Sequence, residues 1–499
     1  MTKKTILSAT LALALISCTG NRFHYSDKIP DTVIRIDTDS ISNTGYIGNG
    51  AQWDPYSLDY GSGHVDISQA DWEKIYSRLD YMKPGFIRMM QNTVDKVRDG
   101  ELDPSIGLEH LTHLLDYCQS RNIPVIFGDW GGWMVDSGAK TINSRLIAQA
   151  AEYVRFLVKE KGYTCIRYYN LINEPNGDWS VTNRDFDLWS DAMLILGKEF
   201  KDKGIFGEVT IIGPDAAIWT EGEAWWIGRT AEKLGDIVGL YDIHTYPSKT
   251  TINSGRYSEI ISAYKAQVPE GFKIVMGEIG IKYVDPADSL LNKENIRRAM
   301  ACAHASKTDS QMSVYDHSYG TDMADALFQT INAGYSGSIV WMLDDAMHTH
   351  ETKERLKIWG FWNILGDELF GEEEEKVRPW FYAWSLLCRY IPSGSDFNPV
   401  GISTTGMDYS PVKAVSVTNG GRRTIAAVNV SDTLHTVSLS CSSISKIRNA
   451  RVYLYGEGLY NTEGDCTMIP ENEGVSIDLS GKKAIDLPAG SMIVITDME

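Results

Sequence analysis

Basic residues are scarce in this chain of 499 residues. It has 47 lysines and arginines against 66 aspartates and glutamates, which gives a formal net charge of −19 at pH 7. A surface with this excess of negative charge repels nucleic-acid backbones and other polyanionic surfaces. We therefore expect no nucleic acid among the partners of this protein.

Cysteine is also rare, and its seven copies form neither a CxxC motif nor a cluster with histidine. Metal sites and redox-active dithiols need such spacings, so we expect no metal and no other cofactor. Cys441 and Cys466 could either form a disulfide in an oxidising compartment or remain free. The other cysteines after the N-terminal segment lie in predicted helices or strands as small buried apolar residues: Cys118, Cys165, Cys302 and Cys388.

The apolar run near the N-terminus is too short to span a bilayer as a mature helix. It covers residues 6–16, follows Lys3 and Lys4, and leads into Leu15-Ile16-Ser17-Cys18. This pattern resembles a bacterial lipobox, so we expect residues 1–18 to be a lipoprotein signal peptide with its lipobox and Cys18 to be lipidated. Because Thr19 follows, we expect a lipid anchor in the outer membrane or periplasm. The alternative is an ordinary secretory signal with an incidental cysteine.

A glycine-rich phosphate-binding turn is missing after the first predicted strand, where the sequence reads Gly48-Asn49-Gly50-Ala51-Gln52-Trp53. This disfavours a doubly wound open sheet. Between residues 41 and 391, eight short apolar runs alternate with helical patterns, as in strands covered on both faces. Eight such units in about 350 residues are typical of a (β/α)8 TIM barrel. The predicted strands are residues 45–48, 85–89, 124–128, 166–172, 208–213, 238–244, 273–277 and 337–342.

Capping residues mark the ends of several predicted helices. Ser68 and Asp71 form an N-terminal capping pattern before a helix at 72–82. Gly162 and Gly204 follow predicted helices at 142–161 and 185–203, as glycine C-caps do.

The character of the sequence changes near Pro392. Helical patterns stop, and short alternating runs follow at 414–417, 424–430, 437–439, 451–455 and 492–496. Asn419-Gly420-Gly421 indicates a hairpin between the first two. We predict a β-sandwich over residues 392–499, which a strand at 32–37, within residues 29–40, joins. No low-complexity linker separates the two parts, so we expect them to pack rigidly.

Two glutamates follow predicted barrel strands. Asn173-Glu174-Pro175-Asn176 comes after the fourth strand, and Gly277-Glu278-Ile279-Gly280 ends the seventh. Active sites of such barrels lie at the carboxyl ends of the strands, where side chains converge. Two carboxyl groups about 5–5.5 Å apart can cleave a glycosidic bond, one as nucleophile and one as proton donor. We therefore predict a glycosidase site at Glu174 and Glu278.

The other strand ends also carry polar or aromatic side chains. His244 and Tyr246, two residues apart, share one face at the sixth strand. Aromatic faces suit sugar rings, although large aromatic side chains also fill large cores. The further candidates are Arg88 at strand 2, Asp129, Trp130 and Trp133 after strand 3, Asn173 after strand 4, Asp215 after strand 5, and Trp341 in strand 8.

Together these motifs resemble those of clan A retaining glycoside hydrolases. The motif at Glu174 is similar to the acid/base motif of the β-xylosidase/α-iduronidase family, and that at Glu278 is closer to the nucleophile motif of cellulases. The resemblance covers strands 2–8 and implies a (β/α)8 barrel, with which a C-terminal β-sandwich is compatible. It also implies a cis peptide bond between Trp341 and Met342.

The resemblance assigns roles to the candidates. It implies that Glu278 attacks the anomeric carbon as nucleophile. Glu174 would protonate the leaving oxygen and then deprotonate water. Arg88 would keep Glu278 ionised, and Tyr246 or His244 would orient it. Each of four residues also has a structural alternative. Glu174 and Glu278 could be surface or salt-bridge carboxylates, Arg88 could form an ion pair without function, and His244 could be a core histidine.

The resemblance further implies contacts with the sugar. Asn173 would bond the 2-hydroxyl group, and Trp341 would form the floor beneath the ring. Trp130, Trp133 and Trp219 could be subsite aromatics or packing residues. Four aspartates could be sugar ligands or loop-capping residues: Asp129, Asp215, Asp344 and Asp345.

Four residues outside these strand ends need separate mention. His317 and Tyr319 lie in a long segment after strand 7 and could reach the site. His348 and His350 lie beyond strand 8, but no third ligand accompanies them, so we do not expect a metal there.

The sequence thus predicts a secreted, lipid-anchored retaining glycoside hydrolase. We expect it to cleave a β-type bond in a neutral oligo- or polysaccharide, with the membrane contacted only through the anchor. The rival is a non-catalytic glycan-binding barrel, which would keep the tryptophans without needing both glutamates. A metal-dependent hydrolase on the same barrel is disfavoured by the sparse spacing of histidine and aspartate.

Overall fold

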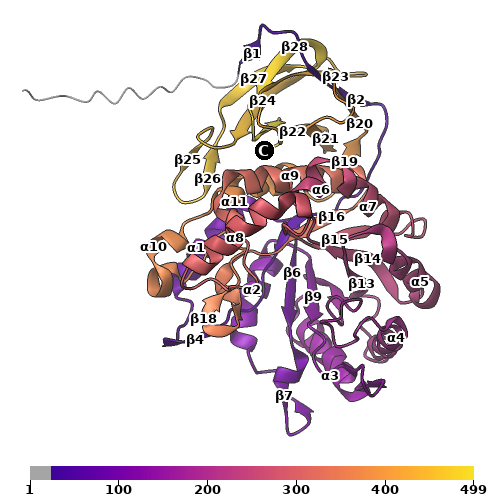
Figure 1. The fold of residues 1–499 in the computed structure, drawn as a ribbon. Coiled ribbons are helices and arrows are strands. Elements are labelled where there is room, and N and C mark those ends of the chain that lie inside the picture. The colour runs from indigo at the N-terminus through magenta and orange to yellow at the C-terminus, as the bar shows by residue number, and fades with distance from the viewer. Residues whose placement is uncertain (1–23) are drawn as a thin grey trace, which may run out of the picture.

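A closed barrel and a two-sheet domain pack against each other in this protein (Figure 1). The computed structural model describes residues 24–499. The signal segment and Cys18 therefore lie outside the described residues. Among the helices of residues 24–499, none combines the length and apolar character needed to cross a membrane.

The barrel has eight parallel strands that follow one another around it in sequence order, so the predicted TIM barrel is confirmed. Most residues of these strands are buried, because helices cover the outside and side chains fill the inside. Six buried residues, one from each of six strands, fill part of the interior: Phe86, Ile126, Ile212, Leu240, Val275 and Ile339. The strands are β3 (Gly48–Gln52), β6 (Phe86–Gln91), β9 (Val125–Asp129), β12 (Ile166–Asn170), β13 (Thr210–Ile218), β14 (Val238–Thr245), β15 (Ile274–Ile279) and β16 (Gly337–Val340).

The first barrel strand was predicted wrongly, at 45–48 instead of Gly48–Gln52. Its sequence, GNGAQ, has no apolar run, yet all five residues are buried. Close packing explains the composition, because a Cβ atom on Gly50 would lie 1.7 Å from the carbonyl oxygen of Phe86. The carbonyl of Gly50 also accepts a hydrogen bond from Trp384 Nε1. Small residues therefore form a strand here that hydrophobicity alone does not reveal.

Helices connect successive barrel strands on the outside. Ser68 and Asp71 form the predicted capping box at the start of α1. The predicted helix at 142–161 is split, since π-helical geometry replaces the α-helix from Phe156 to Glu160. The helices are α1 (Gln69–Met82), α2 (Leu108–Ser120), α3 (Ser144–Arg155), α4 (Phe186–Asp202), α5 (Trp225–Leu234), α6 (Lys249–Asn253), α7 (Arg256–Lys265), α8 (Ser289–Ala301), α9 (His317–Asn332), α10 (Glu372–Glu375) and α11 (Pro379–Tyr390).

The second domain consists of two sheets that enclose their own apolar core. One sheet has the order β1-β28-β23-β2-β20 and the other β19-β21-β22-β29-β24-β27. The C-terminal β-sandwich is thereby confirmed. Its strands are β1 (Tyr25–Ser26), β2 (Thr32–Ile36), β19 (Asp396–Asn398), β20 (Val400–Thr404), β21 (Val412–Asn419), β22 (Arg422–Asn429), β23 (His435–Cys441), β24 (Lys446–Tyr455), β27 (Asn472–Asp478), β28 (Ser480–Leu487) and β29 (Ser491–Thr496).

The N-terminal strand β2 is part of this sandwich. It pairs in parallel with β23 and antiparallel with β20. The turn between β21 and β22 is the two-residue hairpin of Gly420 and Gly421, both with positive φ. That geometry is the one that favours glycine in tight hairpins.

Aromatic and apolar side chains join the sandwich to the barrel. Tyr390 of α11 and Tyr453 of β24 are joined by a 2.7 Å hydrogen bond between their hydroxyl groups. Val415 and Val494, on the sandwich, belong to the same hydrophobic cluster as the barrel core. All six cysteines of residues 24–499 are free, so Cys441 and Cys466 do not pair.

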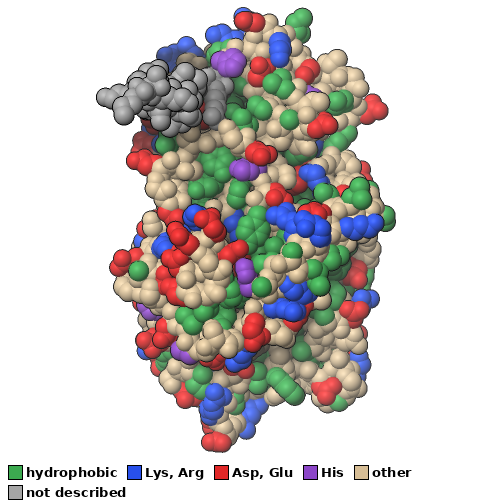
Figure 2. All heavy atoms as spheres, turned by 60° about the vertical axis from the view of Figure 1, so that its left-hand side comes forward, with side chains coloured by type: hydrophobic (Ala, Val, Ile, Leu, Met, Phe, Trp, Pro, Cys, Tyr) green, Lys and Arg blue, Asp and Glu red, His purple; other side chains and the backbone are tan. Residues whose placement is uncertain are grey.

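Several short hairpins extend the loops of the chain. They are β4 (Asp59–Tyr60) with β5 (Gly63–His64), β7 (Val97–Arg98) with β8 (Glu101–Leu102), β10 (Val135–Asp136) with β11 (Thr141–Ile142), β17 (Thr349–His350) with β18 (Thr352–Leu356), and β25 (Asn461–Glu463) with β26 (Thr467–Ile469). On the face drawn in Figure 2, acidic and basic side chains are interspersed around hydrophobic ones.

Candidate active site

Glu174 stands in a tight turn after β12. The strand ends at Asn170, and Glu174 has a left-handed backbone with φ of 47°. The turn closes when the amide of Gly177 donates a 2.9 Å hydrogen bond to the carbonyl of Glu174. Glu174 Oε2 accepts a 2.7 Å hydrogen bond from Trp179 Nε1. The turn thus brings an indole five residues further on back against the carboxylate.

Glu278 is the fifth residue of β15 and points into the same end of the barrel. Its Oε2 accepts a 2.9 Å hydrogen bond from Arg88 Nη1 of β6. Its Oε1 accepts a short hydrogen bond from the hydroxyl of Tyr246, which directly follows β14. Two donors from different parts of the barrel therefore fix the carboxylate of Glu278.

His244 lies between the two glutamates. Its Nδ1 is 3.1 Å from Glu174 Oε1 and 3.8 Å from Glu278 Oε2. One carboxylate oxygen of each glutamate lies within 4.8 Å of the other. On its far side, His244 Nε2 is 2.8 Å from Asp215 Oδ1. The imidazole of His244 therefore lies close to three carboxylates: Glu174 after β12, Asp215 in β13 and Glu278 in β15.

The charges around these groups shift their pKa values. Burial raises the pKa of Glu278, while His244 and Arg88 act against this rise. Burial lowers the pKa of His244, but the charges of Asp215 and Glu278 outweigh it and raise this pKa to about 10. Burial raises the pKa of Asp215, yet His244 and Arg88 together hold it below its ordinary value. At neutral pH, His244 is therefore protonated and Asp215 is ionised.

Arg88 lies beneath the site and is fully buried. Its Nη1 contacts Gln52 Oε1, and its Nη2 donates to Asn173 Oδ1 at 2.8 Å and to Asp215 Oδ2 at 3.1 Å. Because the guanidinium presents its donors in a rigid plane, it fixes groups from several strands at once. It neutralises part of the negative charge of Glu278 and Asp215.

The two glutamates face a pocket of about 370 Å³. Two indoles line the side near Glu174, where Trp179 and Trp219 meet edge to face with ring centroids 5.7 Å apart. They are 53% and 45% exposed, so their faces are open to a ligand. The lining residues are Trp130, Asn173, Glu174, Trp179, Trp219, Tyr246, Glu278, Lys282, Asp309, Trp341 and Lys357.

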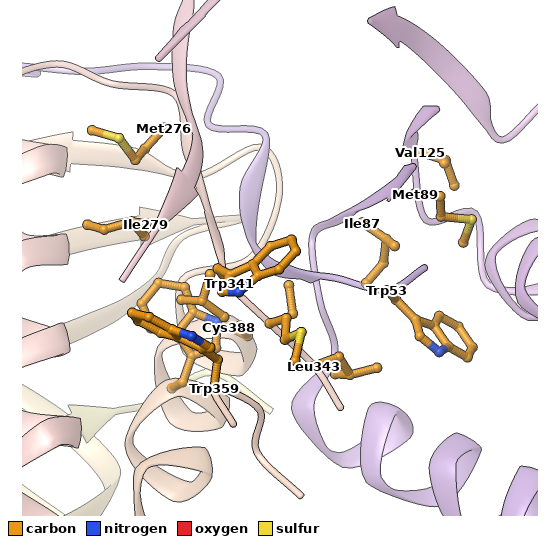
Figure 3. Close-up of a cluster of buried hydrophobic side chains, with 14 of the residues drawn as sticks. Trp53, Ile87, Met89, Val125, Met276, Ile279, Trp341, Leu343, Trp359 and Cys388 are labelled. Carbon is orange, nitrogen blue, oxygen red and sulfur yellow. The ribbon is translucent and has the colours of Figure 1, made fainter. Parts of the chain in front are cut away.

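Trp341 lies in the pocket wall just after β16. The peptide bond between Trp341 and Met342 is cis, as expected. The ring of His348 stacks on Trp341 at 5.4 Å between centroids, and Trp130 meets it edge-on at 6.2 Å. Figure 3 draws Trp341 within the buried cluster that also contains Trp359. The indole is therefore held firmly and leaves only 5% of its surface exposed.

Some predicted site residues do not line this pocket. Asp129 is fully buried, and its carboxylate accepts hydrogen bonds from the amides of Thr93 and Gly131 at 2.6 and 2.7 Å. Burial raises the pKa of Asp129 to about 6. It holds the loop that carries Trp130. Trp133 is 75% exposed and is not one of the lining residues.

The residues after strand 7 and strand 8 also differ from the expectation. His317 contacts Tyr455 and Tyr460 of the sandwich side, and the Tyr319 hydroxyl accepts a hydrogen bond from the amide of Ile281. Neither residue lines the pocket. Asp344 accepts hydrogen bonds from Trp362 Nε1 and other donors, and acts as a structural acceptor. Asp345 forms an ion pair with Arg378, and His348 Nε2 lies 2.7 Å from Asp54 Oδ2, at hydrogen-bond distance.

The sequence did not reveal five residues of the site. Trp179 was hidden because its contact with Glu174 depends on a turn. Gln52 was hidden because the first strand was placed too early. The other three come from loops beyond strand ends, where no sequence period locates them: Lys282, Asp309 and Lys357.

In the part of the chain that the structure describes, two groups of side chains have spacing compatible with a metal ion. They are Glu174 with His244 and Glu278, and Asp215 with Asp242 and His244. His244 belongs to both, and with its pKa raised to about 10 it is an imidazolium without a free lone pair. Arg88 already forms ion pairs with both Glu278 and Asp215. The donor set is therefore that of an ion-pair network and does not suit a metal.

Comparison with known proteins identifies the fold. No protein-family model and no curated protein matches the sequence. A family 30, subfamily 8 xylanase from Clostridium acetobutylicum is 13% identical, with 93% of this chain and 98% of that chain covered and a TM-score of 0.58. A monomeric β-xylosidase from Caulobacter crescentus CB15 is 15% identical, with 93% and 99% covered and a TM-score of 0.57. A family 51 α-L-arabinofuranosidase from Bifidobacterium longum is 11% identical, with 94% and 99% covered and a TM-score of 0.62.

These similarities extend over the barrel and the sandwich together. At such low identity they establish the fold alone. The chain therefore has the barrel-and-sandwich fold of these glycoside hydrolases, while its chemistry depends on its own side chains.

Proposed function

We propose that this protein is a retaining glycoside hydrolase that cleaves a β-type bond by double displacement. The observation that carries the proposal is the approach of Glu174 and Glu278 across one pocket, with an oxygen of each within 4.8 Å of the other. Retaining enzymes hold their carboxyl groups about 5–5.5 Å apart, while inverting enzymes leave about 6.5–9.5 Å for a water molecule. The separation favours retention.

In the first step, an oxygen of Glu278 attacks the anomeric carbon while the bond from that carbon to the leaving oxygen breaks. The leaving oxygen takes a proton from Glu174, and a glycosyl ester of Glu278 remains. Arg88 and Tyr246 hold Glu278 as a carboxylate in the attacking position. Glu174 Oε1 and His244 Nδ1, 3.1 Å apart, are close enough to share the proton that is delivered.

In the second step, Glu174 removes a proton from water as the water oxygen attacks the anomeric carbon. The ester bond breaks, and Glu278 regains its negative charge beside Arg88. Asn173, whose Oδ1 accepts from Arg88 Nη2 at 2.8 Å, keeps its amide nitrogen available for the sugar hydroxyl. Glu278 thus loses its negative charge in the first step and regains it in the second, and Arg88 and Tyr246 are positioned to stabilise that charge.

The tryptophans of the pocket are placed for the two sugars that the glycosidic bond joins. Trp179 and Trp219 lie beside Glu174, which protonates the leaving group, so they are placed for the departing sugar. Trp341 lies on another part of the lining, where it can meet the sugar that becomes attached to Glu278. Aromatic rings favour this contact because sugar rings have apolar faces.

A non-catalytic glycan-binding barrel is the rival. Such a protein needs the tryptophans, but it has no use for a buried carboxylate held by both Arg88 and Tyr246. Burying charged groups costs several kcal/mol per ion. The network of Arg88, His244 and Asp215 beneath Glu278 therefore favours an enzyme.

Product analysis on a panel of aryl β-glycosides and oligosaccharides tests the proposal. We expect the first product seen by ¹H NMR to be the β anomer, and we expect Glu278→Ala to abolish turnover. Glu232→Ala, at an exposed position on α5, is the matched control and should be fully active. An α anomer as first product would disprove retention, and full activity of Glu278→Ala would disprove the glycosidase.

A further inference from the structure

Two lysines line the pocket near Glu278 in a protein that is otherwise strongly acidic. Lys282 and Lys357 form this wall together with Asp309. The two lysines come from the segments that follow β15 and β18. We name Lys282, Asp309 and Lys357 the cationic wall.

One lysine of the cationic wall is already neutralised. Lys357 Nζ is 3.0 Å from Asp309 Oδ2, and Asp309 Oδ1 accepts a 3.2 Å hydrogen bond from Trp359 Nε1. Burial raises the pKa of Asp309, but the charges of Lys357 and Lys282 outweigh it and lower this pKa. Asp309 is therefore ionised, and its charge balances Lys357.

The charge of Lys282 also acts on the pKa of Asp309, but Lys282 makes no direct contact of this kind. Within residues 24–499, the ammonium group of Lys282 forms no ion pair and no hydrogen bond. It lies 4.5 Å from the ring centroid of Tyr246 and 5.5 Å from that of Trp359. These two rings hold the charge in place without neutralising it.

The backbone of Lys282 is fixed from two directions. Its amide donates to the carbonyl of Pro247 at 3.3 Å, and its carbonyl accepts from Ser248 Oγ at 2.9 Å. The carbonyl of Ile281 accepts a hydrogen bond from Gln311 Nε2. The side chain therefore enters the pocket from a rigid base, as ligand-binding residues require.

The nucleophile does not need this charge. Glu278 already has Arg88 and Tyr246 as donors and His244 at 3.8 Å. Within residues 24–499, Lys282 is not among the ion-pair partners of Glu278. An unpaired, preorganised ammonium group that faces a sugar pocket is suited to an anionic group of the ligand.

We propose that Lys282 binds a sugar unit that carries a single negative charge, either a uronate carboxylate or a sulfate ester. The inference rests on the proposed function and adds the class of substrate: an acidic glycan, with the charged unit on the Glu278 side of the pocket. It revises the neutral oligo- or polysaccharide that was expected from the sequence. Surface charges more than about 8 Å away are screened at physiological salt. The charge that an anionic sugar meets in the pocket is therefore set by Lys282 and not by the net charge of the protein.

Binding of free sugars tests the proposal, with quenching of the pocket tryptophans as the signal. The probes are D-glucuronate, D-galacturonate and D-glucose 6-sulfate, each compared with D-glucose or D-galactose. We expect at least one acidic sugar to bind about tenfold more tightly than its neutral counterpart, the size of one charge-assisted contact. The uronates and the sulfate ester are separate arms that identify the anionic group. This preference should weaken as salt is added.

Variants connect the preference to Lys282. Lys282→Met keeps most of the length of the stem and should abolish the preference for the acidic sugar, while Lys282→Arg should keep most of it. Lys293→Met, at an exposed position on α8, is the control and should bind as the wild type does. Equal binding of neutral and acidic sugars, no binding of any acidic sugar at low salt, or an unchanged preference in Lys282→Met would overturn the proposal.

The two proposals can fail separately. If Glu278-dependent hydrolysis is confined to neutral glycosides, the anionic subsite is wrong and the glycosidase stands. If acidic sugars bind through Lys282 and no glycoside is hydrolysed, the subsite stands and the glycosidase is wrong.

Discussion

The indole of Trp179 donates a 2.7 Å hydrogen bond to Glu174 although more than half of its surface is exposed. A Cβ atom on Gly177 would lie 2.3 Å from this indole, so the glycine allows the turn to fold back. One side chain therefore both offers a face to the departing sugar and orients the proposed acid/base. Binding of the leaving group and proton transfer to it are connected through Trp179.

Replacing Trp179 with phenylalanine should separate these two tasks. The Trp179→Phe variant keeps an aromatic face but loses the N–H group, so we expect kcat to fall about tenfold for substrates with poor leaving groups while KM changes little. Activated aryl glycosides should be affected less, because they need little protonation. Trp179→Ala should raise KM as well. Steady-state kinetics with both kinds of substrate measure this, and an equal loss for both would refute the acid/base connection.

Azide rescue should distinguish the two glutamates. In Glu174→Ala with an activated aryl β-glycoside, azide should attack the trapped glycosyl-enzyme, raise the rate and give the β-glycosyl azide. In Glu278→Ala it should enter from the opposite face and give the α-azide. NMR of the products identifies the anomer. If the two anomers appear with the variants exchanged, the roles of Glu174 and Glu278 are reversed.

The acid limb of the pH profile should report the ionisation of Glu278. The nucleophile must be ionised, and burial raises its pKa, so kcat/KM should rise with pH through a midpoint above the ordinary glutamate value of 4.5. The hydrogen bond from Tyr246 acts against this rise. Tyr246→Phe should therefore move the acid limb to higher pH. A profile that does not move, measured over the same buffers, would contradict this role of Tyr246.

Loss of Arg88 should destabilise the whole protein. Arg88→Met leaves Glu278 and Asp215 without their buried cation, and breaking such a pair costs about 3–5 kcal/mol. Urea unfolding followed by tryptophan fluorescence measures the change. Adding Asp215→Asn to Arg88→Met should recover part of the loss. A single variant as stable as the wild type would mean that the network contributes nothing to folding.

The lipid anchor remains a prediction from Leu15-Ile16-Ser17-Cys18. Replacing Cys18 with serine removes the thiol that would carry the lipid, so the protein should leave the membrane fraction in its native host. Immunoblots of soluble and membrane fractions measure this. Unchanged fractionation of the variant would show that the cysteine is incidental.

The barrel and its two glutamates could be predicted because their signals are local. Short apolar strands alternate with capped helices. Glu174 follows such a strand within four residues, and Glu278 lies near the end of another. The glycine-rich strand β3 could not be predicted in this way, because its burial reflects close packing against Phe86 and Trp384. Hydrophobicity does not record that kind of contact.

The rest of the pocket depends on contacts across long sequence distances. Lys357 meets Asp309 across a separation that no period or motif encodes. Asp129 has the expected place at a strand end, but its carboxylate is used by the loop that holds Trp130. The conformation of the loop after the strand decides whether a strand-end side chain faces the pocket or the loop, and the sequence pattern does not show this conformation.

The position of β2 between β20 and β23 has a consequence for biosynthesis. Thr32 of β2 contacts Thr404 of β20, 372 residues later in the chain. The ribosome therefore makes one strand of the sandwich long before it makes the partners of that strand. During this interval an apolar strand with unpaired edges is exposed to wrong pairing, the hazard of strands whose partners are distant. Both β20 and β23 must emerge before the two edges of β2 are paired, so truncation of the chain before β23 would harm a segment close to the N-terminus.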